Sequence, residues 1–243
     1  MIDTKTVFIT GVSRGLGASL VKKFVEEGYS VCGLTRTEND HKQYEEKYDS
    51  EQYFGVVADI SNPGDVRNAV EELVKKYGRI DVVFNNAAIY PKINFLDEPA
   101  EEFLHALLVN VGGIANVCKA VLPIMVQQKQ GKIYNVGSWA DINPALNSAS
   151  YSASKGSIHA LTKAIAADIS ELNLEIEVHE WIPGHLNTRM SDFTGIDPDI
   201  SALWATQIVK QEATTKNCIF ENNREWRPPL GIRQKIRRLF LPF

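Results

Sequence analysis

The stretch Thr10-Gly11-Val12-Ser13-Arg14-Gly15-Leu16-Gly17 follows an apolar, β-branched run at residues 6–10 and precedes a segment with helical periodicity. Glycines in such a turn let the backbone bend sharply and approach a ligand that a Cβ atom would exclude. The helix that follows would offer unpaired N–H groups and the positive end of its dipole, which suits a pyrophosphate. A strand, a glycine-rich turn and an amphipathic helix in this order therefore predict a dinucleotide-binding fold.

Short apolar runs alternate with longer helical stretches along the rest of the chain. One helix has clear boundary signals, with Asn62 as a capping residue before Pro63 and Gly78 after its last turn. Repeated strand–helix units imply parallel strands joined by right-handed crossovers. We therefore predict an α/β fold, a single doubly wound Rossmann-type domain with a mainly parallel sheet of about seven strands and helices on both faces. The expected strands are residues 6–10, 30–34, 53–58, 80–84, 132–136, 175–182 and 217–220, and the expected helices are residues 16–27, 63–77, 101–128 and 153–172.

The composition is that of an ordinary globular chain. The 243 residues are 44% hydrophobic and 23% charged, which excludes a mostly disordered protein and supplies enough apolar residues for a core. Lys and Arg number 26 and Asp and Glu number 30, so the formal charge is −4 at pH 7. A charge this close to neutral argues against nucleic acid as the main partner.

The charge is divided unevenly along the chain. Residues 224–243 carry six basic side chains and one acidic side chain, a local charge of +5, and the rest of the chain carries −9. We therefore predict a dinucleotide-binding domain at residues 1–223 and a basic tail at residues 224–243. The tail suits subunit packing or a frayed end better than contact with an anionic membrane. Its apolar residues with helical spacing are Ile232, Ile236, Leu239 and Phe240.

The cysteines and the N-terminus bear on the cellular compartment. Cys32, Cys118 and Cys218 lie far apart and form no CxxC pair, so free thiols in a reducing compartment are the simpler interpretation. Residues 1–10 lack the basic start and apolar run of a secretory signal, and nowhere do 18 apolar residues follow one another. The sequence therefore predicts a cytoplasmic protein without a transmembrane helix.

A set of short motifs follows the glycine turn in a fixed order. The motifs are, in chain order, Asp59-Ile60, Asn85-Asn86-Ala87-Ala88, Asn110, Ser138, the YxxxK segment from Tyr151 to Lys155, and Pro183-Gly184 with Thr188 behind it. With these motifs and a turn of the form TGxxxGxG, the chain resembles the short-chain dehydrogenase/reductase family from about residue 5 to residue 220. It departs from the family pattern at Ala88, where the family has glycine.

The resemblance implies an oxidoreductase that uses a nicotinamide cofactor and acts on a small molecule. Family members are commonly homodimers or homotetramers formed through two long helices, here residues 101–128 and 153–172. The catalytic residues implied are Asn110, Ser138, Tyr151 and Lys155. The residues implied to contact the cofactor are Gly11, Ser13, Arg14, Gly15, Leu16, Gly17, Arg36, Asp59, Ile60, Asn86, Ala87, Tyr151, Lys155, Pro183, Gly184, Leu186 and Thr188.

The end of the second expected strand bears on the form of the cofactor. The strand ends Gly33-Leu34-Thr35-Arg36, without the acidic residue that holds the ribose 2′-hydroxyl in NAD enzymes of this fold. A guanidinium offers a planar fork of donors that suits a 2′-phosphate, and both Arg36 and Arg14 are candidates. Taken alone, either arginine could equally be a solvated surface residue. Together with the missing carboxylate they predict NADP(H) rather than NAD(H).

Tyr151 and Lys155 are four residues apart at a helix start, so their side chains share one face of the helix. A phenol titrates at about 10 in water, and an adjacent ammonium ion together with the oxidised nicotinamide would favour the phenolate. Ser138 would hydrogen-bond the substrate oxygen. By the family pattern, Asn110 would hold a water molecule that contacts Lys155. We expect hydride transfer between nicotinamide C4 and a carbonyl or secondary alcohol carbon, with Tyr151 as the acid or base.

Two other functions stay open from the sequence. One is an epimerase or dehydratase that acts through transient oxidation, although relatives of that kind usually carry an extra substrate domain that 243 residues cannot hold. The other is a sensor that binds NADPH without catalysis, which the complete set of catalytic residues disfavours. The sequence names neither the substrate nor the preferred direction of the reaction.

Candidate substrate contacts lie in two loops. Trp139, Asp141 and Asn143 follow Ser138 in a loop that often lines the substrate pocket in this family, and His185 lies in the loop after Pro183-Gly184. A surface position for His185 is the alternative. The resemblance also implies that the domain at residues 1–223 includes the catalytic site and a short substrate lid at residues 189–211. This expected lid contains several apolar side chains, which predict an apolar or mixed pocket.

No metal site is expected. His179-Glu180 and His185 superficially match a zinc-protease helix, but the histidines are six residues apart instead of four. Pro183-Gly184 would also break any helix between them.

Overall fold

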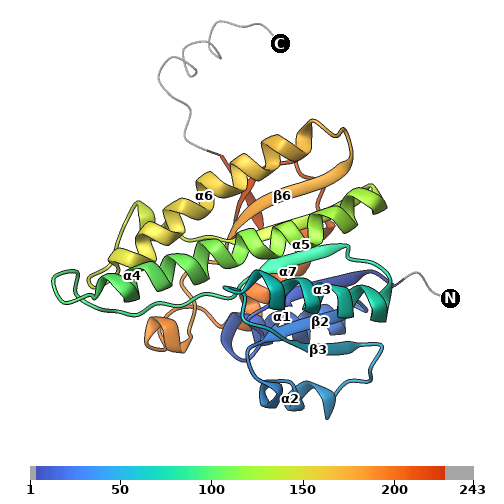
Figure 1. Cartoon of the computed structure of the whole chain (residues 1–243), viewed down its shortest axis with the longest axis horizontal. Helices are drawn as coiled ribbons and strands as arrows, with labels where there is room; N and C mark the ends of the chain where they lie inside the picture. The colour runs from blue at the N-terminus through green and yellow to red at the C-terminus, as the bar shows by residue number, and fades with distance from the viewer. Residues whose placement is uncertain (1–3, 228–243) are drawn as a thin grey trace, which may run out of the picture.

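The computed structural model describes residues 4–227, which form one eight-stranded sheet with helices on both faces (Figure 1). The strands lie in the order β3-β2-β1-β4-β5-β6-β7-β8, and every neighbouring pair is parallel except β7 with β8. This confirms the predicted doubly wound α/β fold, with one strand more than expected. The strands are β1 (Thr6–Thr10), β2 (Ser30–Thr35), β3 (Tyr53–Val57), β4 (Val82–Asn85), β5 (Gln130–Val136), β6 (Glu175–Ile182), β7 (Ile219–Glu221) and β8 (Arg224–Trp226).

The larger helices form two layers, one on each face of the sheet. Side chains of α1 and α7 pack on one face, and those of α3, α5 and α6 pack on the other. A π turn at Leu108–Gly112 joins α4 to α5. The helices are α1 (Gly15–Glu26), α2 (Lys42–Glu45), α3 (Pro63–Tyr77), α4 (Ala100–Leu107), α5 (Gly113–Gln128), α6 (Ala149–Ser170) and α7 (Pro198–Lys210).

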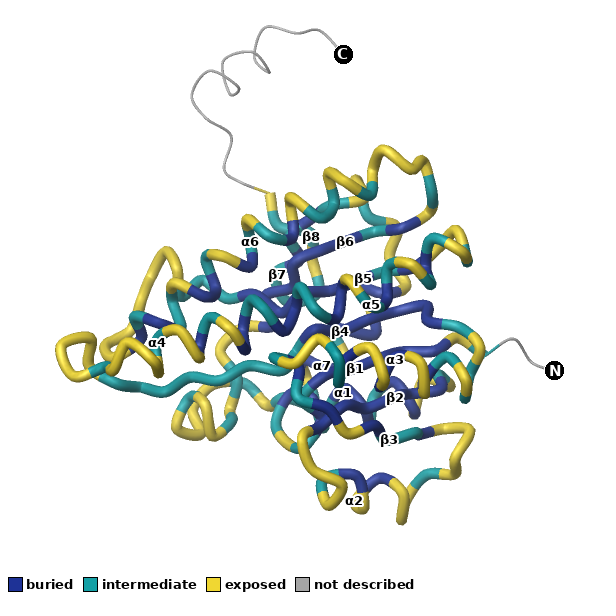
Figure 2. Tube along the Cα trace, in the orientation of Figure 1, coloured by how far each residue is buried: buried dark blue, intermediate teal, exposed yellow. Residues whose placement is uncertain are grey.

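Apolar burial on both faces holds these layers together. Phe24 of α1 and Ile208 of α7 are fully buried on one face, and Leu73 of α3 and Val121 of α5 on the other. Figure 2 shows the buried residues concentrated along the central strands. Each such side chain contributes about 1.5–3 kcal/mol through the burial of apolar surface. Strands covered on both faces need apolar residues at nearly every position, which the sequences of β1 and β2 supply.

The order of the strands reverses between β1 and β4. Ligands of open α/β sheets bind in the crevice at such a point, outside the carboxyl ends of the strands. The glycine turn begins directly after Thr10, the last residue of β1. The fold therefore places the predicted nucleotide turn at the edge where a ligand is expected.

The helical stretch Ala100–Gln128 meets the length and composition criteria for a membrane-spanning helix, with a mean hydropathy of 1.7, although no transmembrane helix was predicted. In the fold, Val117, Val121 and Met125 of this stretch pack in the apolar layer on the sheet. The π turn lies where the sequence suggests a bend, and Pro123 lies within α5 without ending it. These three residues thus form part of the core, whereas Leu104 and Leu108 of the same stretch are exposed.

The C-terminal part of the described chain is a hairpin. β7 and β8 pair antiparallel around a turn in which Asn222 has a left-handed φ of 55°. The predicted basic tail at residues 224–243 therefore begins too early, because Arg224–Trp226 is the edge strand of the sheet. Residues 228–243, with the expected helical spacing of Ile232 to Phe240, lie outside the described residues.

The predicted lid at residues 189–211 contains two different structures. Its second part is helix α7, in which Ala202, Ala205 and Ile208 are fully buried in the layer shared with α1. Two small residues on this face let the helices α1 and α7 approach closely, so this part of the predicted lid is packed into the fold. The loop before α7, residues 184–197, is the part that lies at the carboxyl ends of the strands.

The three cysteines are free and buried, as the lack of a pairing pattern predicted. Burial raises the pKa of Cys118 to about 12 and that of Cys32 well above its usual value. Both thiols are therefore protonated at neutral pH.

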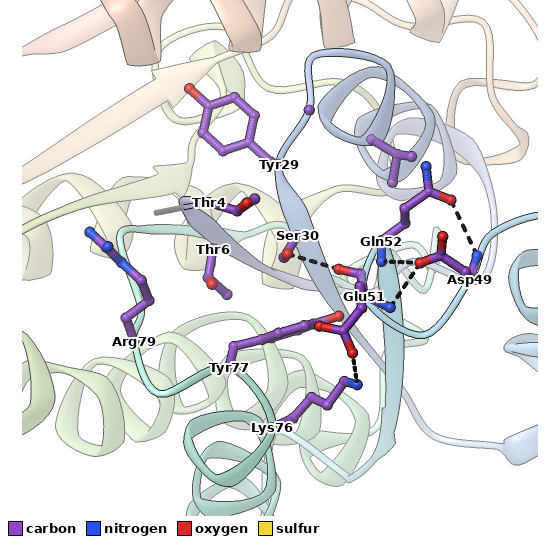
Figure 3. A pocket seen from close by; sticks show the side chains of 12 residues that line it. Thr4, Thr6, Tyr29, Ser30, Asp49, Glu51, Gln52, Lys76, Tyr77 and Arg79 are labelled. Atoms are coloured by element: carbon purple, nitrogen blue, oxygen red, sulfur yellow. Dashed lines mark hydrogen bonds and ion pairs between the residues drawn. The ribbon is translucent and has the colours of Figure 1, made fainter. Parts of the chain in front are cut away.

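A hollow of about 540 Å³ lies at the opposite, amino-terminal edge of the sheet (Figure 3). Ser30 and Tyr77 line it together with Glu51 and Lys76. Lys76 pairs with Glu51 at 2.6 Å, and the Ser30 hydroxyl donates to the Glu51 carbonyl at 2.8 Å. These polar groups thus bond with one another, and none of the motif residues lies among those that line the hollow.

The boundaries of α3 follow from two residues. The Asn62 side chain accepts hydrogen bonds from the N–H groups of Gly64 at 2.9 Å and Asp65 at 3.4 Å, and Gly78 ends the helix with φ 76°. The capping bonds satisfy two N–H groups that the helix itself leaves without partners.

We predict that Asn62→Ala lowers the free energy of unfolding by about 1 kcal/mol, because both capping bonds are lost. Urea unfolding followed by circular dichroism measures the change. Asn68→Ala, at an exposed interior position of the same helix, is the control and should leave stability unchanged or slightly raised. Equal losses for both variants would contradict the capping role.

Candidate active site

The glycine turn brings three loops into contact at the carboxyl ends of the strands. A Cβ atom on Gly11, where φ is 73°, would lie 2.8 Å from the Cα of Ala87 in the loop after β4. A Cβ on Gly17 would lie 2.1 Å from the Gly11 carbonyl oxygen. Gly15, with φ 58°, faces Thr188 of the loop after β6, whose methyl group would be 3.3 Å from an added Cβ. The glycines are therefore required by close backbone approach and by left-handed geometry.

Hydrogen bonds join the glycine turn to the loop after β4. The Asn86 side-chain amide donates to the carbonyls of Thr10 at 3.0 Å and Gly11 at 3.1 Å. The Thr10 hydroxyl accepts from the N–H groups of Asn86 and Ala87 at 3.1 and 3.0 Å. Ala88, which stands in place of the family's glycine, has no positive φ, so alanine fits this loop without strain.

Asn110 lies in the π turn between α4 and α5 and is almost fully buried. Its side-chain oxygen accepts from the Ile89 N–H at 2.8 Å, and its amide donates to the Ile89 carbonyl at 2.9 Å and to Ser154 Oγ at 2.9 Å. The side chain therefore fixes the loop after β4 against α6. π turns recur at functional sites because they displace a residue from regular helical geometry.

Tyr151 and Lys155 lie in the first two turns of α6, which begins four residues earlier than predicted. Lys155 is 4% exposed, and its Nζ donates to the Val136 carbonyl at 2.7 Å and lies 5.5 Å from the centre of the Tyr151 ring. Burial lowers the pKa of Lys155 to about 8, and the charge of Glu180 acts in the opposite direction. The ammonium ion is therefore lost as the pH rises through about 8.

Ser138 directly follows β5 and lies beside Tyr151. Its Oγ accepts from the Ala140 N–H at 3.1 Å and so caps the short turn Trp139–Asp141. Burial raises the pKa of Tyr151 to about 12, a hydrogen bond with Ser138 lowers it, and the neighbouring Tyr90 raises it. The net shift is upward because burial outweighs the Ser138 hydrogen bond. At neutral pH the phenol is therefore protonated.

Tyr90 is a site residue that sequence reasoning missed. Its ring stacks on the Tyr151 ring, with 4.5 Å between centroids and 17° between planes. Lys92 Nζ lies 5.6 Å from the centre of the Tyr90 ring and pairs with Asp192 of the loop after β6 at 2.6 Å. These contacts link Tyr151 to the loop at residues 184–197. Only the position of Tyr90, shortly after the Asn86 motif, hinted at this role.

The four candidate substrate contacts do not gather at one point. Trp139 Nε1 donates to Glu221 at 2.7 Å, and its ring lies 5.1 Å from that of Trp226, so it ties the loop after β5 to the C-terminal hairpin. Asp141 and Asn143 are exposed, and Asp141 packs against Gly156 of α6. His185 is exposed and its Nε2 lies 2.8 Å from Thr194 Oγ1.

The residues expected to select the cofactor lie at the same edge of the sheet. Arg14 precedes α1 and Arg36 follows β2, and both are exposed. Asp59 accepts from the Ser61 N–H and hydroxyl at 2.8 and 2.6 Å, and these bonds, with the nearby Arg36, hold its pKa below the usual range against the effect of burial. Ile60 is buried and fills the space beside Gly113, where a Cβ would be 2.5 Å from its side chain.

The remaining expected cofactor contacts surround the glycine turn. Ser13 is half-buried and Leu16 is buried in the core beneath the turn. The loop after β6 begins at the buried Pro183, whose carbonyl accepts from Ser201 Oγ at 2.9 Å, and continues through Gly184 with φ 89°. Leu186 bridges to Ile196 within this loop.

His179 and His185, whose order superficially matches a zinc-protease helix, lie in different surroundings. His179 is fully buried, with Nε2 2.8 Å from Glu177, and its Nδ1 accepts from the Cys218 N–H at 3.0 Å. His185 lies in the exposed loop after β6. Within residues 4–227, no group of three His, Cys, Asp or Glu side chains is placed to hold a metal ion.

Comparisons with known proteins agree with this geometry. The family model for short chain dehydrogenase matches residues 5–198. An oxidoreductase from Botryotinia fuckeliana is 33% identical over 82% of this chain and 72% of its own length, and an NADPH-dependent pterin aldehyde reductase from Arabidopsis thaliana is 32% identical over 78% of each chain. The crystal structure of 3-ketoacyl-(acyl-carrier-protein) reductase from Brucella melitensis complexed with NADH superimposes with a TM-score of 0.81 at 28% identity, covering 89% of this chain and 96% of that one.

We predict that Gly17→Ala lowers the free energy of unfolding by about 2 kcal/mol or more, because the added methyl group meets a backbone oxygen that cannot move aside. Gly28→Ala is the control, since Gly28 has a positive φ of 82°, which Gly17 lacks, but open space around it, and should cost about 1 kcal/mol. Urea unfolding compares the two. A smaller loss for Gly17→Ala than for Gly28→Ala would contradict the close approach.

Proposed function

The chain belongs to the short-chain dehydrogenase/reductase family, and we propose that it is an NADP(H)-dependent oxidoreductase that interconverts a carbonyl group and a secondary alcohol on a small molecule. The observation that carries the proposal is the meeting of Ser138, Tyr151 and the buried Lys155 at the carboxyl edge that also holds the glycine turn. Acid–base chemistry needs a proton donor within reach of a substrate oxygen, and this edge is where open α/β sheets bind ligands.

Tyr151 and Ser138 act on the substrate oxygen. Their mutual hydrogen bond means that one substrate oxygen can contact both hydroxyls. The raised pKa of Tyr151 keeps the phenol protonated at neutral pH, which is the form that reduction of a carbonyl requires. Ser138 orients the oxygen and Tyr151 donates the proton.

Lys155 compensates the charge that forms when Tyr151 gives up its proton. Its ammonium group lies near the Tyr151 ring and is held in place by the Val136 carbonyl. In this dry environment a positive charge stabilises a phenolate far more than it would in water.

A nicotinamide cofactor suits the glycine turn. Gly11 and Gly15, with φ of 73° and 58°, let the backbone turn from β1 into α1, and the first N–H groups of α1 suit a pyrophosphate. When bound, the nicotinamide ring supplies or accepts the hydride. Thr188 and Asn86 stand at the same turn and would contact it from the loops after β6 and β4.

The proposal of NADP(H) rests on the end of β2. Thr35 is the last residue of β2, and its hydroxyl is bonded to the Thr37 carbonyl at 2.9 Å, so no carboxylate stands there. Arg14, within the glycine turn, and Arg36, directly after β2, are both exposed and suit a 2′-phosphate. The Arabidopsis thaliana relative is named as NADPH-dependent, whereas the Brucella melitensis structure contains NADH.

We also propose that the chain forms a homodimer or homotetramer through the helices α4, α5 and α6. Leu104 and Leu108 on the α4 side of this surface are 62% and 51% exposed. Large apolar side chains exposed together on a helix surface favour burial against a second copy.

We predict that Tyr151→Phe lowers kcat for reduction of an accepted ketone or aldehyde at least about 100-fold, because the proton donor is lost. A panel of ketones, sugars and quinones with NADPH, followed at the NADPH absorbance, identifies the substrate first. Tyr77→Phe, at the opposite edge of the sheet, is the control and should keep full activity. Equal rates for wild type and Tyr151→Phe would overturn the proposed mechanism.

We predict that Arg36→Ala weakens NADPH binding about tenfold and leaves NADH binding unchanged, because only NADPH carries the 2′-phosphate. Fluorescence titration with each cofactor measures the two dissociation constants. Arg67→Ala, an exposed arginine on α3, should change neither. Parallel losses for NADPH and NADH would count against a 2′-phosphate contact.

A further inference from the structure

A buried carboxylate that none of the family motifs includes lies behind the catalytic lysine. Glu180, on β6, is 3% exposed, and its Oε2 lies 2.8 Å from Nδ1 of His159 on α6. His159 follows Lys155 by one helical turn, so both side chains project from the same side of α6. A carboxylate is retained in the interior only where charged or hydrogen-bonding groups compensate it.

Because Gly137 has no side chain, the Glu180 carboxylate can pack against the backbone at this residue. A Cβ at residue 137 would lie 2.0 Å from Glu180 Oε1, so the carboxylate occupies the space that any other residue would fill. The two neighbours of Gly137 are Val136, whose carbonyl accepts a hydrogen bond from Lys155, and Ser138. Glu180 therefore touches the backbone segment that holds both Lys155 and Ser138.

The charges that face Glu180 come from two elements. His159 and Lys155 face it from α6, and Asp141 faces it from the turn after β5. Burial raises the pKa of Glu180, whereas His159 and Lys155 lower it. Glu180 in turn opposes the effect of burial on Lys155, and it is the one charged group that acts on Lys155 among the described residues.

We propose that Glu180, held in place by His159, is a positioning residue that keeps Lys155 as an ammonium ion beside Tyr151. The inference rests on the proposed function of Tyr151 and Lys155. Without the negative charge, a lysine this deeply buried would lose its proton at a lower pH. The phenolate left after proton donation would then lack its compensating charge over part of the neutral range.

The same strand supplies a matched control. Glu177 also bonds to a histidine, His179, at 2.8 Å, but on the other side of β6, where Lys132 is its second partner at 3.3 Å. Glu177→Gln therefore removes a histidine-bonded carboxylate from β6 without touching the surroundings of Lys155.

The first test is the pH dependence of kcat/KM for reduction. In wild type the alkaline limb is expected near the pKa of Lys155, about 8. Glu180→Gln should move this limb down by about half a pH unit or more, whereas Glu177→Gln should leave it in place. Glu180→Asp, which keeps the charge, should restore the wild-type position. A Glu180→Gln profile that coincides with wild type would overturn the proposal.

The second test needs no turnover. In protein labelled with ¹³C at the lysine Cε, the Lys155 resonance is the one lost in Lys155→Arg, and its titration midpoint reports the pKa directly. Glu180→Gln should lower the midpoint, whereas His159→Gln, which keeps a hydrogen-bond donor for Glu180, should not. An unchanged midpoint in Glu180→Gln overturns the inference even if the protein reduces carbonyls. A lowered midpoint in a protein that reduces no member of the substrate panel leaves the charge pairing standing and counts against the proposed function.

Discussion

The contact between backbones at Gly11, Gly17 and Ala87 is the constraint on which the rest of the structure depends. Any side chain at Gly11 or Gly17 would meet backbone atoms at 2.8 Å or less. Because both positions are glycine, the turn after β1 closes onto the loop after β4, and Thr10 and Asn86 can complete their hydrogen bonds. The same turn starts α1, whose apolar face fills one side of the sheet. The glycine turn thus shapes the candidate cofactor site and also sets where α1 packs on the sheet.

Features set by local chemistry were predictable from the sequence. β1 and β6 have the predicted bounds, and α3 begins and ends at the residues whose side-chain and backbone properties mark helix ends. The order of the motifs also predicted which loops meet, because the carboxyl ends of parallel strands share one edge. Asn110, Ser138, Tyr151 and Lys155 all lie at or beside that edge, as the family resemblance implied.

Features that depend on contacts between distant segments were not predictable. Helical periodicity does not tell an exposed lysine from the buried Lys155, and nothing local marks Tyr90 as the ring that stacks on Tyr151. The Glu180–His159 pair joins two elements that are 21 residues apart. The rise in the pKa of Tyr151 also depends on distant segments, since its largest cause is burial.

The C-terminal hairpin explains why the catalytic domain extends beyond residue 223. Trp181 Nε1 donates to the Asn222 carbonyl at 2.9 Å, which fixes the hairpin turn to β6. Glu221 and Trp226 then hold Trp139, the residue directly after Ser138. A short, charged antiparallel strand also ends the sheet without leaving a long apolar edge for another chain to pair with. Arg224–Trp226 reads in sequence as the start of a basic tail, yet in the fold it closes the sheet and supports the loop that positions Ser138 for Tyr151.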